Sequence, residues 1–428
     1  MGIDKTQVKF PIFNFLSPIY KQQKWWFWAA IFVGLAVRIY FVIFTEGTTD
    51  VAVWQFHAAG VLEKGLIGYY HANGEMNHPP FIGIIMSWLL KLSGAGGVPF
   101  RILLRAPFAA LDAGTAILLM YCFCFGPYRF LIAAGYWLHP LAMIFSAYHG
   151  NTDSSVAFFL VLCVFLLSKE KVIWAGVVLG ISFWIKLPGI LAVPAMVFFL
   201  PNWRQRLKFL SACGAAGFLS YIPALLIDPA VVYTNVFGYE GRIVVTTAQT
   251  PTWGPMVLLM PFFNGLPLDW RMKLGEGVLF LSRRGAWLAV GLIVIFSWIR
   301  RSKRTIQQLG ATIAAAYIIL YGLSNSWSFQ YFAWSIPFWF FTPVLFLSVA
   351  TVLTSIYIYS LYWLLCGNPW LLGEWDFLGH PYWPGFIEIF RNTAWLFFFF
   401  SALAFLTAAL YNEVVRIYNQ IRSRNITG

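Results

Sequence analysis

The sequence predicts an all-α polytopic membrane protein. Of its 428 residues, 60% are hydrophobic and only 11% are charged, and the mean hydropathy is +0.71. A soluble protein carries roughly 25% charged residues, so this composition excludes a soluble enzyme, a disordered chain and a disulfide-stapled secreted domain. Aromatic residues reach 19%, which is typical of a protein with many side chains anchored at membrane interfaces.

The spacing of apolar runs predicts about twelve spans, since about 20 apolar residues cross one bilayer. The first run, 25–44, follows four lysines, so the positive-inside rule places the N-terminus in the cytoplasm. Basic connectors then alternate with acidic ones along a single domain, 1–428, which places both termini inside. The later runs lie near 102–125, 130–149, 153–168, 172–186, 188–200, 209–227, 285–299, 309–323, 331–346, 348–366 and 393–411.

The long loops all fall on the non-cytoplasmic side. They cover residues 45–101, 228–284 and 367–392. Within the first loop, segment 50–64 alternates apolar and polar residues at helical spacing, and segment 80–93 is too short to cross comfortably. Both predict interfacial helices. The functional site is therefore expected on the external face.

The net charge and the positions of the cysteines limit the classes of function that fit this chain. The net charge of +13 fits basic loops held on the anionic side of a membrane better than nucleic-acid binding. All five cysteines fall in apolar runs, where they are expected to be small packing residues. The sequence contains no GxxxxGK[ST] loop, no HExxH and no CxxC pair. With no nucleotide-binding domain in view, we expect a membrane-borne substrate.

Asp50, in GTTDVAVWQ, is the first candidate catalytic residue. It directly follows the first span, where an ionised side chain at the lipid boundary is costly unless it is used. One interpretation is a general base that takes a proton from an acceptor hydroxyl. The alternative is an N-cap, in which Thr49 or Asp50 opens the amphipathic helix.

Two further motifs lie on the external side. Asn77-His78-Pro79-Pro80 precedes the second interfacial helix; its prolines suit a helix start, and His78 suits a charged or hydrogen-bonding role near neutral pH. The turn HGNTDSS contains Asp153, which is either a helix cap or a second acid facing Asp50 across one surface.

Basic residues on the external side form another signal. Lys186 in FWIKLPG and Arg242 in FGYEGR lie there against the charge rule. A lipid-linked phosphate is a natural partner for such cations, and snorkelling to lipid headgroups is the alternative. The same two explanations are expected to hold for other basic residues of that side, which are Arg101, Arg105, Arg271, Lys273, Arg283 and Arg284.

The order of these motifs resembles the GT-C superfamily, polytopic glycosyltransferases that use polyprenyl- or dolichyl-phosphate sugars. The stretch TTDVAVWQFHAAGVLEKGLIGYYHANGEMNHPPF looks like the Asp–Gly–Tyr–Pro-Pro pattern of lipid-phosphate-mannose-dependent transferases. YHGNTDSS is similar to the second-loop acidic motif of protein O-mannosyltransferases and aminoarabinose lipid A transferases. FGYEGR, TWG and SFQYFAWSIP look like donor-side segments of the mannosyltransferase branch.

The resemblance implies a GT-C fold, with Asp50 as the catalytic base. The acceptor hydroxyl would attack the anomeric carbon in line, and lipid phosphate would leave with inversion. A single Asp at each acidic site, in place of an Asp-x-Asp pair, argues against a required divalent metal, and no cofactor is expected. The residues expected to contact substrate are His57, His78, Asp153, Lys186, Tyr239, Arg242 and Gln330.

The expected partners are membrane-borne. They are a polyprenyl-phosphate sugar, with mannose favoured by the branch, a lipid-linked or glycan acceptor, and membrane lipids, but no nucleic acid. Two other classes stay open: a polytopic lipid or polysaccharide transporter, and a ligase or polymerase of lipid-linked glycans. The expected location is a bacterial inner membrane with the site on its periplasmic face, or an endoplasmic reticulum membrane.

Overall fold

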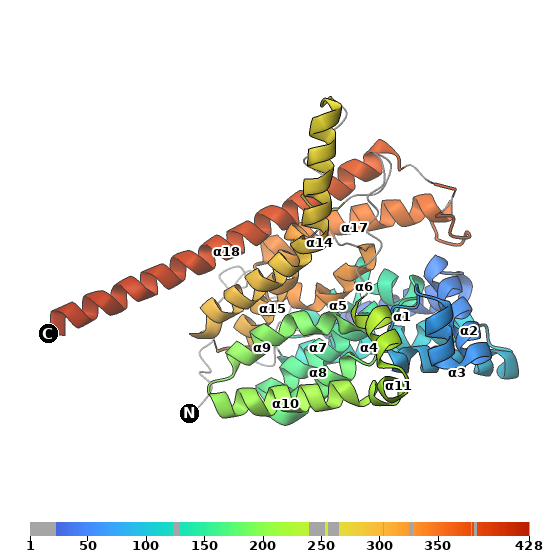
Figure 1. Ribbon diagram of the computed structural model, residues 1–428, viewed down its shortest axis with the longest axis horizontal. Helices are drawn as coiled ribbons and strands as arrows, with labels where there is room; N and C mark the ends of the chain where they lie inside the picture. Colours follow the sequence, from blue (N-terminus) through green and yellow to red (C-terminus); the bar gives the residue numbers. More distant parts are fainter. Residues whose placement is uncertain are drawn as a thin grey trace.

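The computed structural model is helical throughout the part of the chain that it describes, residues 23–122, 129–238, 253–255, 265–302, 304–324, 328–377, 379–380 and 383–427 (Figure 1). The prediction of an all-α protein is confirmed for these residues. The elements are α1 (Gln23–Phe44), α2 (Thr49–Ala72), α3 (Pro80–Gly96), α4 (Phe100–Cys122), α5 (Arg129–Trp137), α6 (Pro140–Met143), η2 (Ile144–Tyr148), α7 (Asp153–Ser168), α8 (Val172–Ser182), η3 (Leu187–Ala192), α9 (Val193–Phe199), α10 (Trp203–Leu219), α11 (Ile222–Ile227), α12 (Pro229–Val232), η4 (Tyr233–Phe237), α14 (Leu268–Ile299), η5 (Arg300–Ser302), α15 (Ile306–Leu323), η6 (Phe329–Trp334), α16 (Ile336–Trp339), α17 (Val344–Cys366) and α18 (Gly385–Thr427).

Within the described residues, six helices are long and apolar enough to cross a membrane, and the bent pair α5 with α6–η2 makes a seventh if it is one span. The chain is therefore an integral membrane protein. Four shorter apolar helices also occur, at 80–96, 153–168, 172–182 and 187–199. A count of twelve requires most of these and other broken segments to cross as well, so it stays a prediction.

Proline explains where the observed helices depart from the expected runs. The run 130–149 bends by 51° where Pro140 follows His139, because proline lacks the N–H that a continuous helix needs. The expected run 331–346 is wrong as one helix: it divides into η6 and α16, and α17 starts after Pro343. Likewise, Pro223 lies in the first turn of α11, just after α10 ends.

Two helices extend into the expected outer loops, although the candidate span within α14 (Leu268–Ile299) begins only at Arg284, where the second expected loop ends. In the second expected loop, 228–284, α14 already begins at Leu268, directly after Pro267. In the third, 367–392, α18 begins at Gly385. Proline at a helix boundary and apolar residues placed at helical spacing favour these longer helices over irregular chain.

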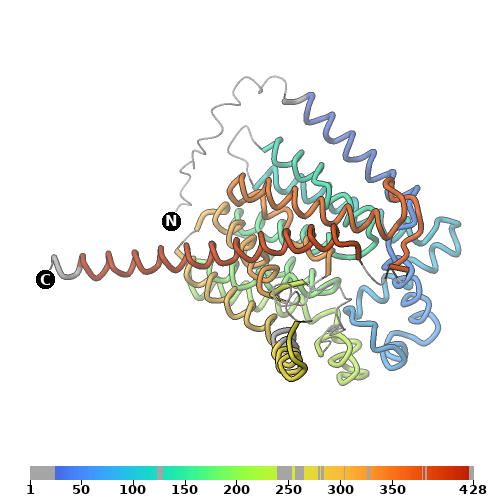
Figure 2. Tube along the Cα trace, turned by 90° about the horizontal axis from the view of Figure 1, so that it is seen from above, coloured from blue at the N-terminus to red at the C-terminus, as the bar shows by residue number. Residues whose placement is uncertain are grey.

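The buried side chains form two hydrophobic clusters. The larger one unites α7, α15, α17 and α18 with the helices packed on them. The smaller one joins α2, α3 and the start of α4 to α11, α12 and η4. Both views place α2 and α3 together at one end of the molecule, while α18 extends beyond the other helices at the opposite end (Figures 1 and 2). Asp50, on the α2–α3 side, and Asp153, on the α7 side, meet at the junction of these two clusters.

The two segments expected to form interfacial helices are helical, as α2 and α3, and they pack on each other. Their position at a membrane interface stays a prediction. Pro80 begins α3 as its first residue, as the His-Pro-Pro motif predicts. α2 is capped by Thr48, whose side chain accepts a hydrogen bond from the Asp50 backbone N–H. The cap is thus neither Thr49 nor Asp50, and the Asp50 carboxylate is free for other partners.

The cysteines of the described part of the chain behave as packing residues. Cys122, Cys163, Cys213 and Cys366 are all buried, and none of these four forms a disulfide. Cys124 lies outside the described residues. These side chains take no part in the polar site.

Candidate functional site

The candidate site starts from the carboxylate of Asp50, in the first turn of α2. Its Oδ2 accepts a hydrogen bond from Asn151 Nδ2 at 2.5 Å and lies 3.1 Å from His149 Nε2. The side chain of Asp50 is 34% exposed, whereas that of His149 is 1% exposed. The carboxylate is therefore fixed from behind by buried partners and open on one side.

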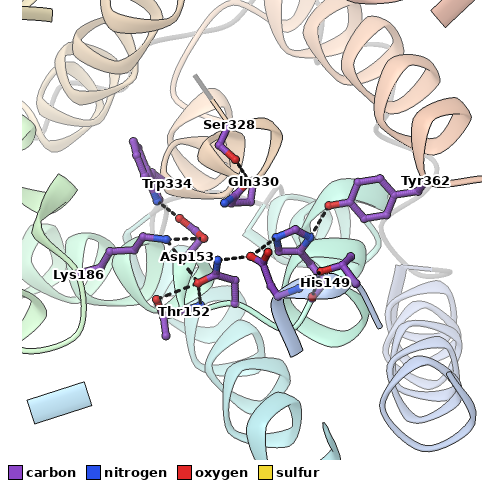
Figure 3. A network of polar contacts seen from close by, with 11 residues as sticks. His149, Thr152, Asp153, Lys186, Ser328, Gln330, Trp334 and Tyr362 are labelled. Atoms are coloured by element: carbon purple, nitrogen blue, oxygen red, sulfur yellow. Dashed lines mark hydrogen bonds and ion pairs between the residues drawn. The ribbon is translucent and has the colours of Figure 1, made fainter. Parts of the chain in front are cut away.

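His149 is held in turn by an aromatic hydroxyl. Its Nδ1 is 2.6 Å from the hydroxyl of Tyr362, on α17 (Figure 3). The imidazole follows the π-helical turn η2 and also packs edge-on against Phe145 and Phe329. The three side chains Asp50, His149 and Tyr362 thus form one chain of polar contacts from the surface into the core.

Asn151 links this carboxylate to a second acid. Its Oδ1 lies 3.5 Å from Lys186 Nζ, and Lys186 forms an ion pair with Asp153 Oδ2 at 2.7 Å. The other oxygen of Asp153 accepts from the indole N–H of Trp334 at 2.6 Å. Figure 3 shows Lys186, Trp334 and Asp153 converging from separate segments of the chain. Asp153, at the start of α7, is 1% exposed and Lys186 is 13% exposed.

The structure therefore brings together three sequence-predicted residues: Asp50, Asp153 and Lys186. The cap interpretation of Asp153 is not supported, because Thr152 is the N-cap of α7 and the Asp153 carboxylate goes to Lys186 and Trp334. Asp153 is buried, so the two acids do not share one exposed surface; the Asn151 amide and the Lys186 ammonium group lie between them.

The electrostatics favour an ionised Asp50. Burial raises its pKa, but the charge of His149, the hydrogen bonds from His149 and Asn151, and the charge of Lys186 together hold the pKa below the ordinary value. A carboxylate in this state is ready to accept a proton or a hydrogen bond from a bound hydroxyl.

His78 lies close enough to the site for the charges of Lys186 and Asp50 to act on it. Its ring is 4.2 Å from that of Trp54. Burial, reinforced by Lys186 and His57, lowers the pKa of His78 to about 3. The expectation of a charged role near neutral pH is therefore wrong, and a hydrogen-bonding role for the neutral ring remains.

The other expected contact residues are less closely tied to the carboxylates. His57 is buried on α2, with Nδ1 2.8 Å from the hydroxyl of Tyr69, and burial lowers its pKa. Gln330, on η6, accepts a hydrogen bond from the Ser328 hydroxyl and is seen beside the network (Figure 3). Tyr239 and Arg242 lie outside the described residues.

Arg105 corrects an expectation. It was expected to snorkel or to reach a lipid phosphate, yet it is fully buried. Its guanidinium donates to the carbonyls of Val42 and Thr45 and to that of Tyr148. Backbone carbonyls, rather than water or lipid, therefore satisfy this cation.

An open cavity of about 550 Å³ adjoins the first turn of α2, a volume within the range of small-ligand sites. Polar and aromatic side chains line it, among them Glu46, Thr49, Gln55, Arg101 and Trp375. Across the described ranges, no group of three or more His, Cys, Asp or Glu side chains is placed to hold a metal ion. The expectation that no divalent metal is required thus stays a prediction.

The sequence analysis did not identify four residues of the site. They are His149, in its role as a partner of Asp50, and Asn151, Trp334 and Tyr362. His149 and Asn151 were in view within the HGNTDSS turn, but nothing in the sequence assigned them to Asp50. Trp334 and Tyr362 carried no local signal, since 181 residues separate Trp334 from Asp153 and 213 separate Tyr362 from His149.

Comparison with known proteins found no matching family model, no matching curated protein and no matching solved structure.

Proposed function

We propose that the protein is an inverting glycosyltransferase of the GT-C type, with Asp50 as general base. It would transfer a hexose, mannose by the resemblance of its motifs, from a polyprenyl-phosphate to a lipid-linked or glycan acceptor on the non-cytoplasmic face. The observation that carries the proposal is a partly exposed carboxylate joined to a cation through the side chain of one asparagine. Asp50 is fixed by His149 and Asn151, and Asn151 leads directly to Lys186.

The proposed chemistry balances with these groups. Asp50 takes the proton of the acceptor hydroxyl as its oxygen attacks the anomeric carbon. The bond from that carbon to the phosphate oxygen breaks, and the lipid phosphate leaves with the electron pair. The proton on Asp50 then passes to water. Because a phosphate leaving group needs no protonation, one base is sufficient.

Lys186 is the group proposed to stabilise the departing phosphate. An ammonium group has three donors, and the observed contacts of Nζ are to Asp153 and Asn151, which leaves one donor for a ligand oxygen. Stabilisation of charge that develops in the transition state is usually the largest electrostatic contribution to such reactions.

The test is transfer of radiolabelled mannose from polyprenyl-phosphate-mannose to membrane lipid extract by the purified protein, comparing wild type with Asp50→Asn. We expect transfer by the wild type and a loss of about 100-fold or more in the variant, the scale of general base catalysis. The matched control is Glu63→Gln, which neutralises an exposed acid of the same helix α2 that does not line the cavity and should retain transfer.

Each outcome discriminates between the candidate functions. Full transfer by a folded Asp50→Asn would exclude Asp50 as the base and turn attention to Asp153. No turnover by the wild type with any sugar of a polyprenyl-phosphate panel would favour the transporter. Transfer of a preassembled glycan, insensitive to Asp50→Asn, would favour the ligase.

A further inference from the structure

Arg105 is a buried cation whose partners are all uncharged. In the described part of the chain its guanidinium and Nε donate to the carbonyls of Arg101, Val42, Thr45 and Tyr148 and to the Thr45 hydroxyl, at 2.6–3.3 Å. A buried charge is costly unless its hydrogen bonds are satisfied. This side chain therefore has a structural task at the point where it lies.

Its main partners are the ends of two helices. Val42 and Thr45 belong to the C-terminal end of α1, and Tyr148 is the last residue of η2. Carbonyls at a helix C-terminus lack intrahelical partners and carry the negative end of the helix dipole. One guanidinium fork thus binds the two helix ends from which the Asp50 and His149 segments emerge.

Two glycines allow these segments to approach each other. Gly47 and Gly150 both have positive φ, +87° and +81°. A Cβ on Gly47 would lie 2.8 Å from the Tyr148 carbonyl, and one on Gly150 would lie 2.3 Å from Val51 Cγ2. The close approach of the two segments is therefore built into the backbone.

The Thr48 hydroxyl completes the connection. It donates to the carbonyl of His149 at 2.7 Å and accepts from the Asp50 backbone N–H at 3.3 Å. A single oxygen atom thus joins the backbones of the two residues whose side chains meet at 3.1 Å.

We propose that Arg105, acting with the Thr48 hydroxyl, is a positioning residue that holds Asp50 in register with His149 and Asn151. The inference deepens the proposed function and rests on the role of Asp50 in it. Arg105 itself touches no reacting atom in this arrangement. Lysine cannot replace it, since a compact ammonium group lacks the planar fork that serves two helix ends at once.

The consequence concerns the charge state of Asp50. The charged or titratable groups that act on it are His149 from the η2 turn, Lys186 from the segment before η3, and His78 from the loop before α3, with Tyr362 of α17 behind His149. If the register is lost, His149 and Asn151 no longer lower the pKa of Asp50, and burial raises it.

The experiment titrates the Asp50 carboxyl in the purified full-length protein by infrared spectroscopy. Aspartate is ¹³C-labelled, and the Asp50→Asn variant identifies the band. In Arg105→Lys and in Thr48→Val we expect the midpoint to rise by about one pH unit or more, and transfer to fall by about 10-fold or more. Arg271→Lys is the matched control, since Arg271 serves a single local carbonyl, that of Leu266, and its midpoint should equal that of the wild type.

A merely structural role would lower the yield of folded protein without moving the midpoint. An unchanged midpoint in folded Arg105→Lys would overturn the proposal. If that variant does not fold, Thr48→Val, which buries no charge, decides in the same way. A shifted midpoint without sugar transfer by the wild type would leave the positioning role standing and refute the glycosyltransferase. Transfer by the wild type together with an unchanged midpoint in the variants would leave the glycosyltransferase standing and refute the positioning role.

Discussion

The properties of Asp50 follow from its partners rather than from its position in the chain. An exposed aspartate has an ordinary pKa, and a buried unpaired one has a raised pKa. Asp50 has a lowered pKa although burial opposes it, because His149, Asn151 and Lys186 surround it. The pair with His149 is therefore expected to control the acid side of any activity that uses the carboxylate.

We predict that activity persists below the usual carboxyl range, about pH 4, and that His149→Gln moves the acid limb upward by about one pH unit. The pKa of Asp50 is lowered in the folded protein, so its contribution to stability is present above the unfolded-state pKa and lost as the pH falls through the folded value. The measurement is the pH profile of transfer, checked by the infrared titration. His71→Gln, at an exposed histidine paired with Asp228, should leave the limb unchanged; an unmoved limb in His149→Gln would refute the prediction.

At this scale the sequence identified charges but not their partners. Asp50, Asp153 and Lys186 stood out because ionisable residues at a membrane boundary are costly, and all three lie in the network. Tyr362 and Trp334 could not be found this way, since aromatic residues are frequent throughout this chain and packing alone decides which of them reach a polar group. Arg105 was misjudged for a related reason, because the sequence does not reveal which cations find backbone carbonyls.

At the scale of elements, the short turns around Gly47 and Gly150 matter more than the long helices. The spacing of apolar residues predicted that the helices exist. The helices break at Pro140, Pro337 and Pro343, and the length of the apolar runs did not reveal these breaks. The π-helical turn η2 has no sequence signature, yet its last residue contacts Arg105 and the next one is His149.

We predict that Gly150→Ala destabilises the protein by roughly 1–3 kcal/mol and lowers transfer. Its φ of +81° is unfavourable for alanine, and the new Cβ would collide with Val51. The measurement is thermal unfolding in detergent micelles, together with the transfer assay. The control is Gly68→Ala, a helical position where the nearest atom is Lys64 Cβ at 3.5 Å, which should be neutral or slightly stabilised. Equal stability of wild type and Gly150→Ala would contradict the role given to this turn.

For the whole molecule, the site lies where the two hydrophobic clusters meet. Asp50 comes from the α2–α3 side and Asp153 from the α7 side. The sequence predicted a polytopic membrane protein with two additional helices in the first loop, and both features are present. It could not settle the number of spans, because helices such as α7 and α8 are shorter than a bilayer requires and only their packing against neighbours decides whether they cross.

The membrane topology can be tested by labelling single cysteines with a membrane-impermeant maleimide in intact and permeabilised cells. Twelve spans with both termini inside place Glu63→Cys outside, and Lys169→Cys, Arg204→Cys and Ser423→Cys inside. The four substituted side chains are exposed, so each can react. Four native cysteines are buried and should give little background, and Cys124 is replaced by serine as a precaution.

Each position tests a different step of the topology. Ser423 lies near the end of α18, at the opposite end of the molecule from α2 and α3 (Figures 1 and 2). Its labelling on the same side as Glu63 would mean an even number of crossings between the two residues, whereas twelve spans require eleven. Lys169 follows α7, and its labelling on the Glu63 side would mean that an even number of crossings separates the two residues, so α4, the bent pair α5 with α6–η2, and α7 cannot each cross once. Either result would refute the twelve-span topology. Labelling of Lys169→Cys, Arg204→Cys and Ser423→Cys only after permeabilisation would place the surface around Asp50 on the face opposite the basic loops. A lipid-linked sugar phosphate would then have to be present on that face to react.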